Sequence, residues 1–132
     1  TVRAADDLFS FCSVDYRPDF ASFARDWAAE AVAVAGRATL AERPSTGPEP
    51  RDDVLFMSAI PWVSFTAFHH PLPTIPSDSI PRFAWGKITG AGTEMCMPLE
   101  VQGHHALMDG IHMARWYEAV QDLFLHPESF LP

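Results

Sequence analysis

The sequence has few cysteines and few basic residues. The first shortage excludes sites built on several cysteines, and the second argues against a nucleic acid partner. Its two cysteines, Cys12 and Cys96, are too few and too isolated for a disulfide framework or a thiolate metal site, so we expect two reduced thiols in the core. Nine basic residues against 17 acidic ones give a net charge of -8. Because this charge repels a phosphate backbone, no nucleic acid partner is expected.

Long apolar runs are also absent. No stretch approaches the roughly 18 uninterrupted apolar residues that cross a bilayer. The first residues, TVRAADD, have neither the basic start nor the apolar core of a signal peptide. We therefore expect a cytoplasmic protein with no membrane partner.

The remaining composition is typical of a globular protein. Of the 132 residues, 48% are hydrophobic and 12% aromatic, unlike the charged and weakly hydrophobic profile of disordered chains. A chain of this length is large enough to bury a core without help from disulfides. It carries no internal repeat or low-complexity tract, and we expect one domain over residues 1–132.

The first third of the sequence predicts a strand and then a helix. Alternating side chains over residues 7–15 are typical of a strand. Asp19 is a suitable N-cap for the helix, and Gly36 is a natural stop. One apolar stripe follows at helical spacing, formed by Phe20, Phe23, Trp27, Ala31 and Val34.

The rest of the chain predicts several strands and a closing helix. Two exposed connections are expected, over residues 37–53 and, rich in proline, over 69–81. Strands are expected at VLFMSAI and WVSFTAF, with a bend or bulge at Pro61, and at FAWGKIT and MCMPLEVQG around the turn GAGTE. The segment IHMARWYEAVQDLF presents one helical face, formed by Ile111, Ala114, Tyr117, Val120 and Phe124. The fold class is therefore α+β, with a mixed, largely antiparallel sheet and flanking helices.

The heptapeptide HHALMDG, residues 104–110, carries the clearest chemical signal. A neutral imidazole at a junction between strand and helix is well suited to accept a hydroxyl proton near pH 7. Asp109 precedes a glycine and can cap the next helix or hold the loop through an ion pair. Taken alone, the motif favours a buried histidine followed by an N-capping aspartate over a catalytic histidine.

A wider pattern resolves this choice. HHALMDG, the upstream MSAIPWVSFTAF and FAWGKITGAGTEMCMPLEVQG, and the closing helix together resemble the chloramphenicol acetyltransferases, from about Leu8 to Phe124. The resemblance implies the coenzyme A-dependent acyltransferase fold. It also implies acetyl-CoA as co-substrate and a small-molecule hydroxyl acceptor, chloramphenicol or a similar compound. The acetyl group then passes directly to the acceptor in a ternary complex, without an acyl-enzyme.

The resemblance assigns roles to particular residues. The family's general base is the second histidine of the motif, which matches His105, and its oxyanion donor matches Ser58 in SAIPW. The motif's aspartate matches Asp109, whose family role is to pair with an arginine near the chain start. That arginine is not identifiable in this sequence.

Further matches concern the two substrates. Trp62 and Lys87 fall where the family contacts coenzyme A, as an apolar wall and as a cation for a phosphate. Phe68 matches an aromatic side chain of the acceptor pocket. At neighbouring pocket positions, where the family usually has apolar or hydroxyl side chains, this sequence has His70, Arg82 and Ala84. The acceptor therefore need not be chloramphenicol.

Members of the family have a substantial N-terminal portion, which supplies strands, a helix and acceptor-pocket aromatics. The resemblance does not extend to that portion. We therefore expect an N-terminally truncated domain, the C-terminal part of the fold. If nothing replaces that portion, the chain should depend on oligomerisation and show little or no acetyl transfer. The family forms trimers with active sites between subunits, so a homotrimer is expected.

Three alternatives remain open. The same motif occurs in dihydrolipoamide acyltransferases and in the condensation domains of peptide synthetases, whose acceptors are lipoyl-bound or carrier-bound. A truncated homologue can also persist as an inactive ligand-binding or assembly module. The histidines at 69, 70, 104, 105 and 112 raise the question of a metal, but adjacent strand histidines point to opposite faces, so none is expected.

Overall fold

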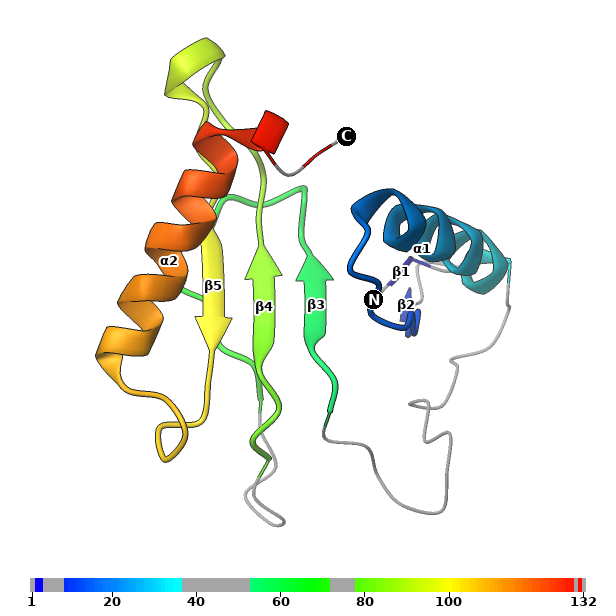
Figure 1. The fold of residues 1–132 in the computed structure, drawn as a ribbon, viewed down its shortest axis with the longest axis horizontal. Coiled ribbons are helices and arrows are strands. Elements are labelled where there is room, and N and C mark those ends of the chain that lie inside the picture. Colours follow the sequence, from blue (N-terminus) through cyan, green and yellow to red (C-terminus); the bar gives the residue numbers. More distant parts are fainter. Residues whose placement is uncertain (1, 4–8, 37–52, 72–77, 130, 132) are drawn as a thin grey trace. The chain divides into compact units, whose positions relative to one another are not determined.

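The structure is a computed structural model that describes residues 2–3, 9–36, 53–71, 78–129 and 131 (Figure 1). The chain forms two compact units. One contains Thr1–Pro50 and Gly110–Pro132, and the other contains Arg51–Asp109. The expectation of a single domain stays a prediction.

The unit formed by Arg51–Asp109 is built on a three-stranded sheet. Its strands are β3 (Phe56–Ala59), β4 (Arg82–Trp85) and β5 (Leu99–Gln102), with β4 in the middle (Figure 1). β3 runs parallel to β4, whereas β5 runs antiparallel to it. The expected mixed sheet in an α+β protein is therefore confirmed.

The two faces of this sheet differ in chemistry. Residues that are paired in register point to the same face, and neighbours along a strand point to opposite faces. One face therefore carries two rows, Phe56–Arg82–Gln102 and Ser58–Ala84–Glu100. The other face is apolar and carries Met57, Ala59, Phe83, Trp85, Leu99 and Val101. The face that carries Arg82, Gln102, Ser58 and Glu100 is called the polar face.

The chain bends after β3, as Pro61 predicts, but the second strand expected there, WVSFTAF, does not form. In a regular parallel ladder, one residue of β3 would bond both Trp85 and Lys87. Here the N–H of Ile60 bonds Trp85 O at 2.8 Å, but Lys87 N–H bonds the carbonyl of Val63 at 2.8 Å. Pro61 and Trp62 are therefore extruded as a bulge, closed by a hydrogen bond from Val63 N to Ile60 O. Residues 63–70 then continue without regular secondary structure.

The strands expected at FAWGKIT and MCMPLEVQG are confirmed only in part, because β4 covers the first three residues of FAWGKIT and β5 the last part of MCMPLEVQG. Between them, a single antiparallel bridge joins Thr89 to Cys96, and a 3₁₀ turn, η2, covers Gly92–Glu94. Gly90 and Gly92 have φ angles of 82° and 56°. Because side chains other than glycine rarely adopt these angles, the glycines of GAGTE permit the chain reversal.

The other unit contains a short antiparallel pair and the helix expected after Asp19. β1 (Val2–Arg3) pairs with β2 (Phe9–Ser10). The strand expected over residues 7–15 is therefore wrong beyond Ser10, because residues 11–17 make no ladder; residues 7 and 8 lie outside the described part. α1 (Phe20–Ala35) begins where Asp19 caps it and ends before Gly36.

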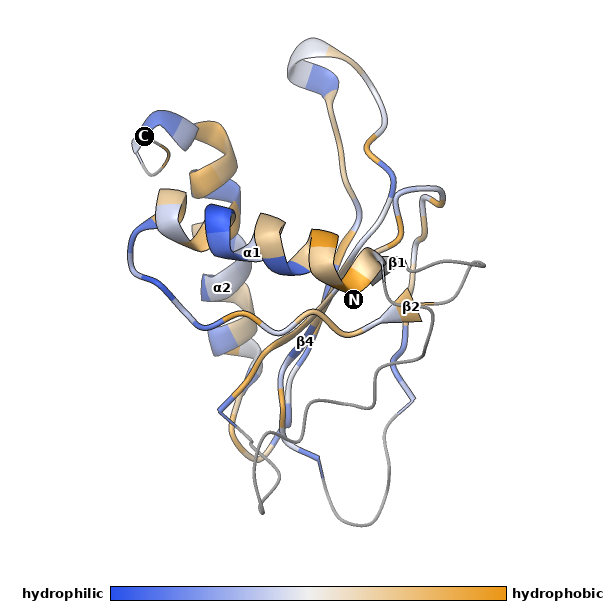
Figure 2. Ribbon diagram, turned by 90° about the vertical axis from the view of Figure 1, so that its right-hand side faces the viewer, coloured by the Kyte–Doolittle hydropathy of each residue, from blue (hydrophilic) through white to orange (hydrophobic). Residues whose placement is uncertain are grey.

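The apolar stripe of α1 is only partly buried. Val34 is fully buried, whereas Phe20 and Trp27 are half exposed. Apolar residues gather toward the C-terminal end of this helix (Figure 2). In the other unit, Ile80 and Ala84 are the buried hydrophobic residues among those described.

The closing helix, α2, is confirmed over Gly110–Leu125 and is followed by the 3₁₀ turn η3 (Pro127–Ser129). Its half-buried residues are Met113, Trp116 and Val120, so only Val120 of the expected face is among them. Of the two expected connections, residues 37–52 and 72–77 lie outside the described residues, whereas residues 69–71 and 78–81 are described and contain no helix or strand, as expected. Within the described ranges, no helix has the length and apolar character needed to cross a membrane.

Candidate active site

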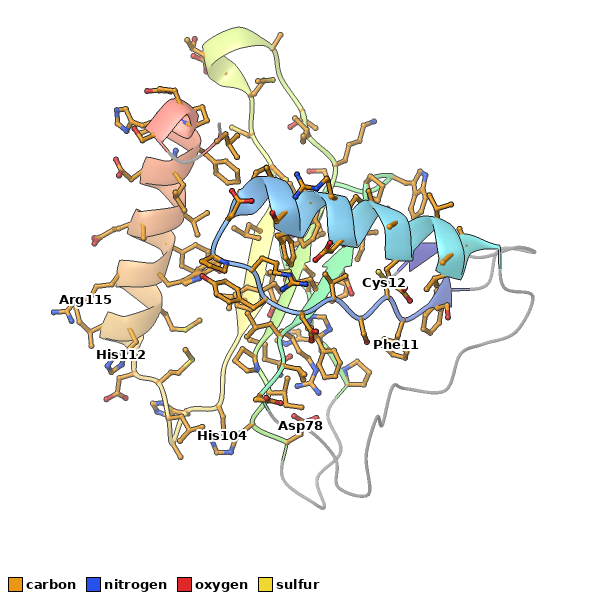
Figure 3. The ribbon with its side chains drawn as sticks, turned by 45° about the vertical axis from the view of Figure 1, so that its right-hand side comes forward. Phe11, Cys12, Asp78, His104, His112 and Arg115 are labelled. Carbon is orange, nitrogen blue, oxygen red and sulfur yellow. The ribbon has the colours of Figure 1, made fainter. Side chains whose placement is uncertain are left out.

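The HHALMDG loop begins just beyond β5 and turns back on itself at once. The backbone N–H groups of Leu107 and Met108 both bond the carbonyl of His104, at 2.9 and 3.1 Å. Because β5 is antiparallel to β4, His104 lies at the same end of the sheet as Asp78, which precedes β4 (Figure 3). The tight turn exposes His105, whose side chain is 89% accessible.

Hydrogen bonds give the two adjacent histidines different tautomers. Nδ1 of His104 accepts a hydrogen bond from Ala106 N–H at 3.2 Å, so in the neutral ring the proton is on Nε2. Nδ1 of His105 lies 3.1 Å from the carbonyl oxygen of Met108. Because a carbonyl oxygen only accepts, Nδ1 of His105 must donate, and the neutral ring leaves a lone pair on Nε2. His105 is thus the histidine of the pair that presents Nε2 as a base.

Asp109 lies beside this imidazole. Its Oδ1 is 3.6 Å from Nδ1 of His105, and its side chain is 71% exposed. At that distance the carboxylate stabilises a positive charge on the ring by electrostatic attraction, an effect that solvent weakens for exposed groups. The sequence left open whether Asp109 reaches His105, and the structure places the two side chains together.

Ser58 is in the middle of β3 and is half-buried on the polar face. In its row it pairs with Ala84, which pairs with Glu100. β5 ends at Gln102. From Ser58, this strand end is two strands away across the sheet, at about 4.8 Å per strand, and two residues away along the strand, at about 3.3 Å per residue. The register therefore keeps the backbone of Ser58 well apart from the strand end that His105 follows.

Trp62 and Lys87 are brought close by the bulge after β3. Trp62 is extruded in the bulge and is 68% exposed, and Lys87 is exposed two residues after β4. Lys87 N–H bonds the carbonyl of Val63, the residue next to Trp62, at 2.8 Å. An exposed indole and an exposed ammonium group thus leave neighbouring backbone segments.

Phe68 belongs to an aromatic and polar cluster. Its ring lies 5.5 Å from the ring of Phe65 and 4.9 Å from that of His70, in an edge-on arrangement with His70. Nε2 of His70 lies 3.4 Å from Oε2 of Glu100. Phe68 is therefore connected, through His70, to the row that contains Ser58.

Arg82, at a position matched to the acceptor pocket, is buried and engaged in an ion pair. Its Nη2 is 2.5 Å from Oδ2 of Asp78, and Nη1 bonds the carbonyl of Ile80 at 3.0 Å. The guanidinium also lies over the ring of Phe56, 5.2 Å from its centroid. These contacts join the start of β4 to the segment before it.

The sequence reasoning missed two members of these clusters, Glu100 and Asp78. The alternation Leu99–Glu100–Val101–Gln102 puts Glu100 on one face of a strand, a signal that was present. Nothing local indicated that His70, in the irregular segment after the bulge, would face it. Asp78 follows proline-rich residues, and its pairing with Arg82 depends on where that segment meets β4.

A metal centre finds no support in the part of the chain that is described. No group of three or more histidine, cysteine or acidic side chains is placed there to hold an ion. Neither Cys12 nor Cys96 forms a disulfide, and the expectation that both lie in the core is wrong, because Cys12 is half-buried and Cys96 is exposed.

Comparison with known proteins adds a family assignment to this geometry. The family model described as chloramphenicol acetyltransferase matches residues 2–121. A chloramphenicol acetyltransferase of Streptomyces acrimycini is 36% identical over 121 residues, 92% of this chain and 53% of that protein. Those of Campylobacter coli and Proteus mirabilis are 29% and 40% identical over 117 and 70 residues, which are 89% and 53% of this chain and 55% and 32% of those proteins. The chain thus spans about half the length of the curated relatives it matches over most of its own length.

Proposed function

Because the chain belongs to the chloramphenicol acetyltransferase family, we propose that the protein transfers an acetyl group from acetyl-CoA to a hydroxyl of chloramphenicol or a similar small molecule. The observation that carries this proposal is the hydrogen bond from Nδ1 of His105 to the Met108 carbonyl. It leaves Nε2 of His105 as the base that such a transfer needs.

In the proposed reaction, Nε2 of His105 takes the proton of the acceptor hydroxyl. The hydroxyl oxygen attacks the thioester carbonyl carbon, the new C–O bond forms, and the C–S bond breaks. The coenzyme A thiolate leaves and takes up the proton that His105 holds, which returns the ring to its neutral state. Asp109, 3.6 Å from Nδ1, stabilises the transient imidazolium.

Ser58 is the proposed oxyanion donor. Its hydroxyl would stabilise the negative charge on the carbonyl oxygen in the tetrahedral transition state, a contribution of about 10²-fold in rate. Because the register separates Ser58 from the strand end before His105, we propose that the site forms between subunits of a homotrimer. His105 then comes from one copy and the acceptor pocket from another.

Three further residues have proposed contacts with the substrates. The exposed Trp62 would line the pantetheine arm of coenzyme A, and Lys87 would pair with one of its phosphates. Phe68 would line the acceptor pocket. Acetyl-CoA is the only co-substrate proposed, and no metal takes part. The lack of a disulfide between the two cysteines suits a cytoplasmic location.

The test compares His105 with His126. Each of these histidines contacts an aspartate that is four residues away in the sequence. His105→Gln should lower kcat by about 10²- to 10⁴-fold, because the general base is lost. His126→Gln is the matched control, since Nδ1 of His126 lies 3.0 Å from Oδ1 of Asp122 and its side chain is also exposed. The control should keep full activity. Release of the coenzyme A thiol in the presence of chloramphenicol measures both.

Other outcomes would redirect the assignment. Equal rates for the two variants would remove His105 from the chemistry. Binding of acetyl-CoA or chloramphenicol without thiol release would favour an inactive ligand-binding homologue. Thiol release with dihydrolipoamide or a carrier-bound thiol, but with no small hydroxyl compound, would favour the related acyltransferases.

A further inference from the structure

The carboxylate of Glu100 has a buried oxygen that accepts no hydrogen bond from a described residue. Its side chain is 20% exposed and that of His70 is 15% exposed. Oε2 of Glu100 and Nε2 of His70 are 3.4 Å apart, an ion-pair distance, but without hydrogen-bond geometry. Both atoms are buried without a hydrogen-bond partner among the described residues, as is Oε1 of the neighbouring Gln102. Two acceptors on the polar face therefore lack a donor, and such groups are costly to bury.

The nearest cation on the polar face is not available to Glu100. Arg82 is in the adjacent row, but its guanidinium bonds both oxygens of Asp78 and the carbonyl of Ile80. With His70 neutral, the pair of Glu100 and His70 carries one negative charge. A ligand that brings a positive charge and hydrogen-bond donors would supply what this cluster lacks.

The position of the pair connects it to the proposed acceptor site. Glu100 is in the same row of the polar face as Ser58, with only the methyl group of Ala84 between them. His70 is held edge-on against the ring of Phe68, the proposed acceptor-pocket residue. The carboxylate of Glu100 is thus placed to contact one end of a bound acceptor, at a distance from the hydroxyl that is acetylated.

We propose that Glu100, oriented by His70, selects acceptors that carry a protonated amine in addition to the hydroxyl that is acetylated. This inference rests on the proposed acetyl transfer and deepens it by naming the acceptor class as amino alcohols. The overall negative charge of the chain acts in the same direction, because it attracts a cationic acceptor.

The test uses two acceptors that differ at one nitrogen. Chloramphenicol carries an uncharged amide, and removal of its dichloroacetyl group gives a protonated amine on the same skeleton. The protein should show a higher kcat/KM for the amine. Glu100→Gln, which keeps the shape and removes the charge, should lower the ratio of amine to amide by at least about tenfold.

Two further variants separate recognition from folding. His70→Phe keeps the ring against Phe68 but removes Nε2, and it should lower the same ratio by a smaller factor. Glu94→Gln changes an exposed carboxylate of the same unit and should leave the ratio unchanged. A Glu100→Gln protein that loses thermal stability but keeps the wild-type ratio would show that Glu100 has only a structural role.

Binding measurements distinguish a failure of this inference from a failure of the proposed reaction. Calorimetric titration of each compound into the protein needs no turnover. Tighter binding of the amine that is lost in Glu100→Gln, without acetyl transfer, would support amine recognition and remove the proposed reaction. Acetyl transfer that prefers the amide in the wild-type protein, or a Glu100→Gln substitution that leaves the ratio of amine to amide unchanged, would overturn amine recognition and leave the reaction standing.

Discussion

Asp19 stabilises the start of α1 through its ionised form. Its Oδ2 accepts a hydrogen bond from Ser22 N–H at 2.8 Å. The pKa of its carboxyl group is lowered, first by a side-chain hydrogen bond with Ser22, then by the backbone bond, and less by the charge of Arg25. The stabilisation is therefore present above the ordinary pKa of an aspartate and is lost as the pH falls through the lowered value.

This linkage makes the effect of substitution dependent on pH. At pH 7, Asp19→Ala should lower Tm by a few degrees, because one orphan N–H of the first helical turn loses its acceptor. The difference from wild type should shrink as the pH falls below about 4. Asp19→Asn is the control, since its amide caps without ionising. Thermal melts followed by circular dichroism measure all three, and a difference independent of pH would contradict the role of the charge.

Single residues of the site were predictable where their partners are close in sequence. His105 bonds the carbonyl of Met108, three residues away, and contacts Asp109, four residues away. Such geometry follows from one local turn, so a motif reports it well. The pair of His70 and Glu100 depends instead on how an irregular segment crosses the sheet, which no short-range pattern specifies.

At the scale of elements, Gly86 determines how the bulge after β3 returns to the sheet. A Cβ atom at this position would lie 2.6 Å from the carbonyl oxygen of Val63 and 2.7 Å from Cγ of Pro98. The first contact is with backbone, which cannot move aside as a side-chain tip can. The bulge that carries Trp62 therefore depends on the absence of a side chain at position 86.

Gly86→Ala should accordingly affect both stability and cofactor binding. We expect a loss of about 1–3 kcal/mol of folding free energy from overpacking. We also expect a higher KM for acetyl-CoA, because Trp62 and Lys87 are displaced together. Gly36→Ala is the matched control, since its nearest contacts are ordinary at 3.9 Å. Urea titration and steady-state kinetics provide the measurements, and an unchanged KM in a destabilised variant would separate the bulge from coenzyme A.

The ion pair between Asp78 and Arg82 fixes the start of β4. The two side chains are 10% and 11% exposed, so neither is well solvated. Asp78→Asn should cost about 3 kcal/mol or more, because it leaves a buried guanidinium without its counter-charge. The double variant Asp78→Leu with Arg82→Met should cost less than Asp78→Asn, because it removes both charges. Denaturant unfolding of both proteins tests this order, and the reverse order would show that Arg82 does not need its carboxylate.

Elements with a strong period were predictable, and those whose ends depend on other segments were not. α1 and α2 follow from apolar spacing and, for α1, from the cap at Asp19. The run WVSFTAF has the composition of a strand, but the hydrogen bond from Lys87 goes to Val63 after a bulge, and no ladder continues beyond it. Strand propensity measures how well a side chain fits a sheet, and the sheet must still provide a partner strand.

At the scale of the whole molecule, the unit that contains the candidate site leaves large apolar side chains accessible. Trp62 and Leu107 are 68% and 69% exposed, and Leu55, Met57 and Val63 are about half exposed. Large apolar side chains that are exposed in this way are available for contact with another protein. Together with the proposed division of His105 and Ser58 between subunits, this predicts self-association.

The dependence of that association on salt follows from the charge of the chain. Each copy carries a net charge of -8, so copies repel one another at low ionic strength. Contacts between apolar surfaces do not weaken when salt is added, whereas the repulsion is screened within about 10 Å at 0.1 M. Analytical ultracentrifugation should therefore give a mass of three chains, with an association constant that rises as salt is added. A single-chain mass at every protein and salt concentration would contradict the trimer, and dissociation by salt would show that ion pairs hold the copies together.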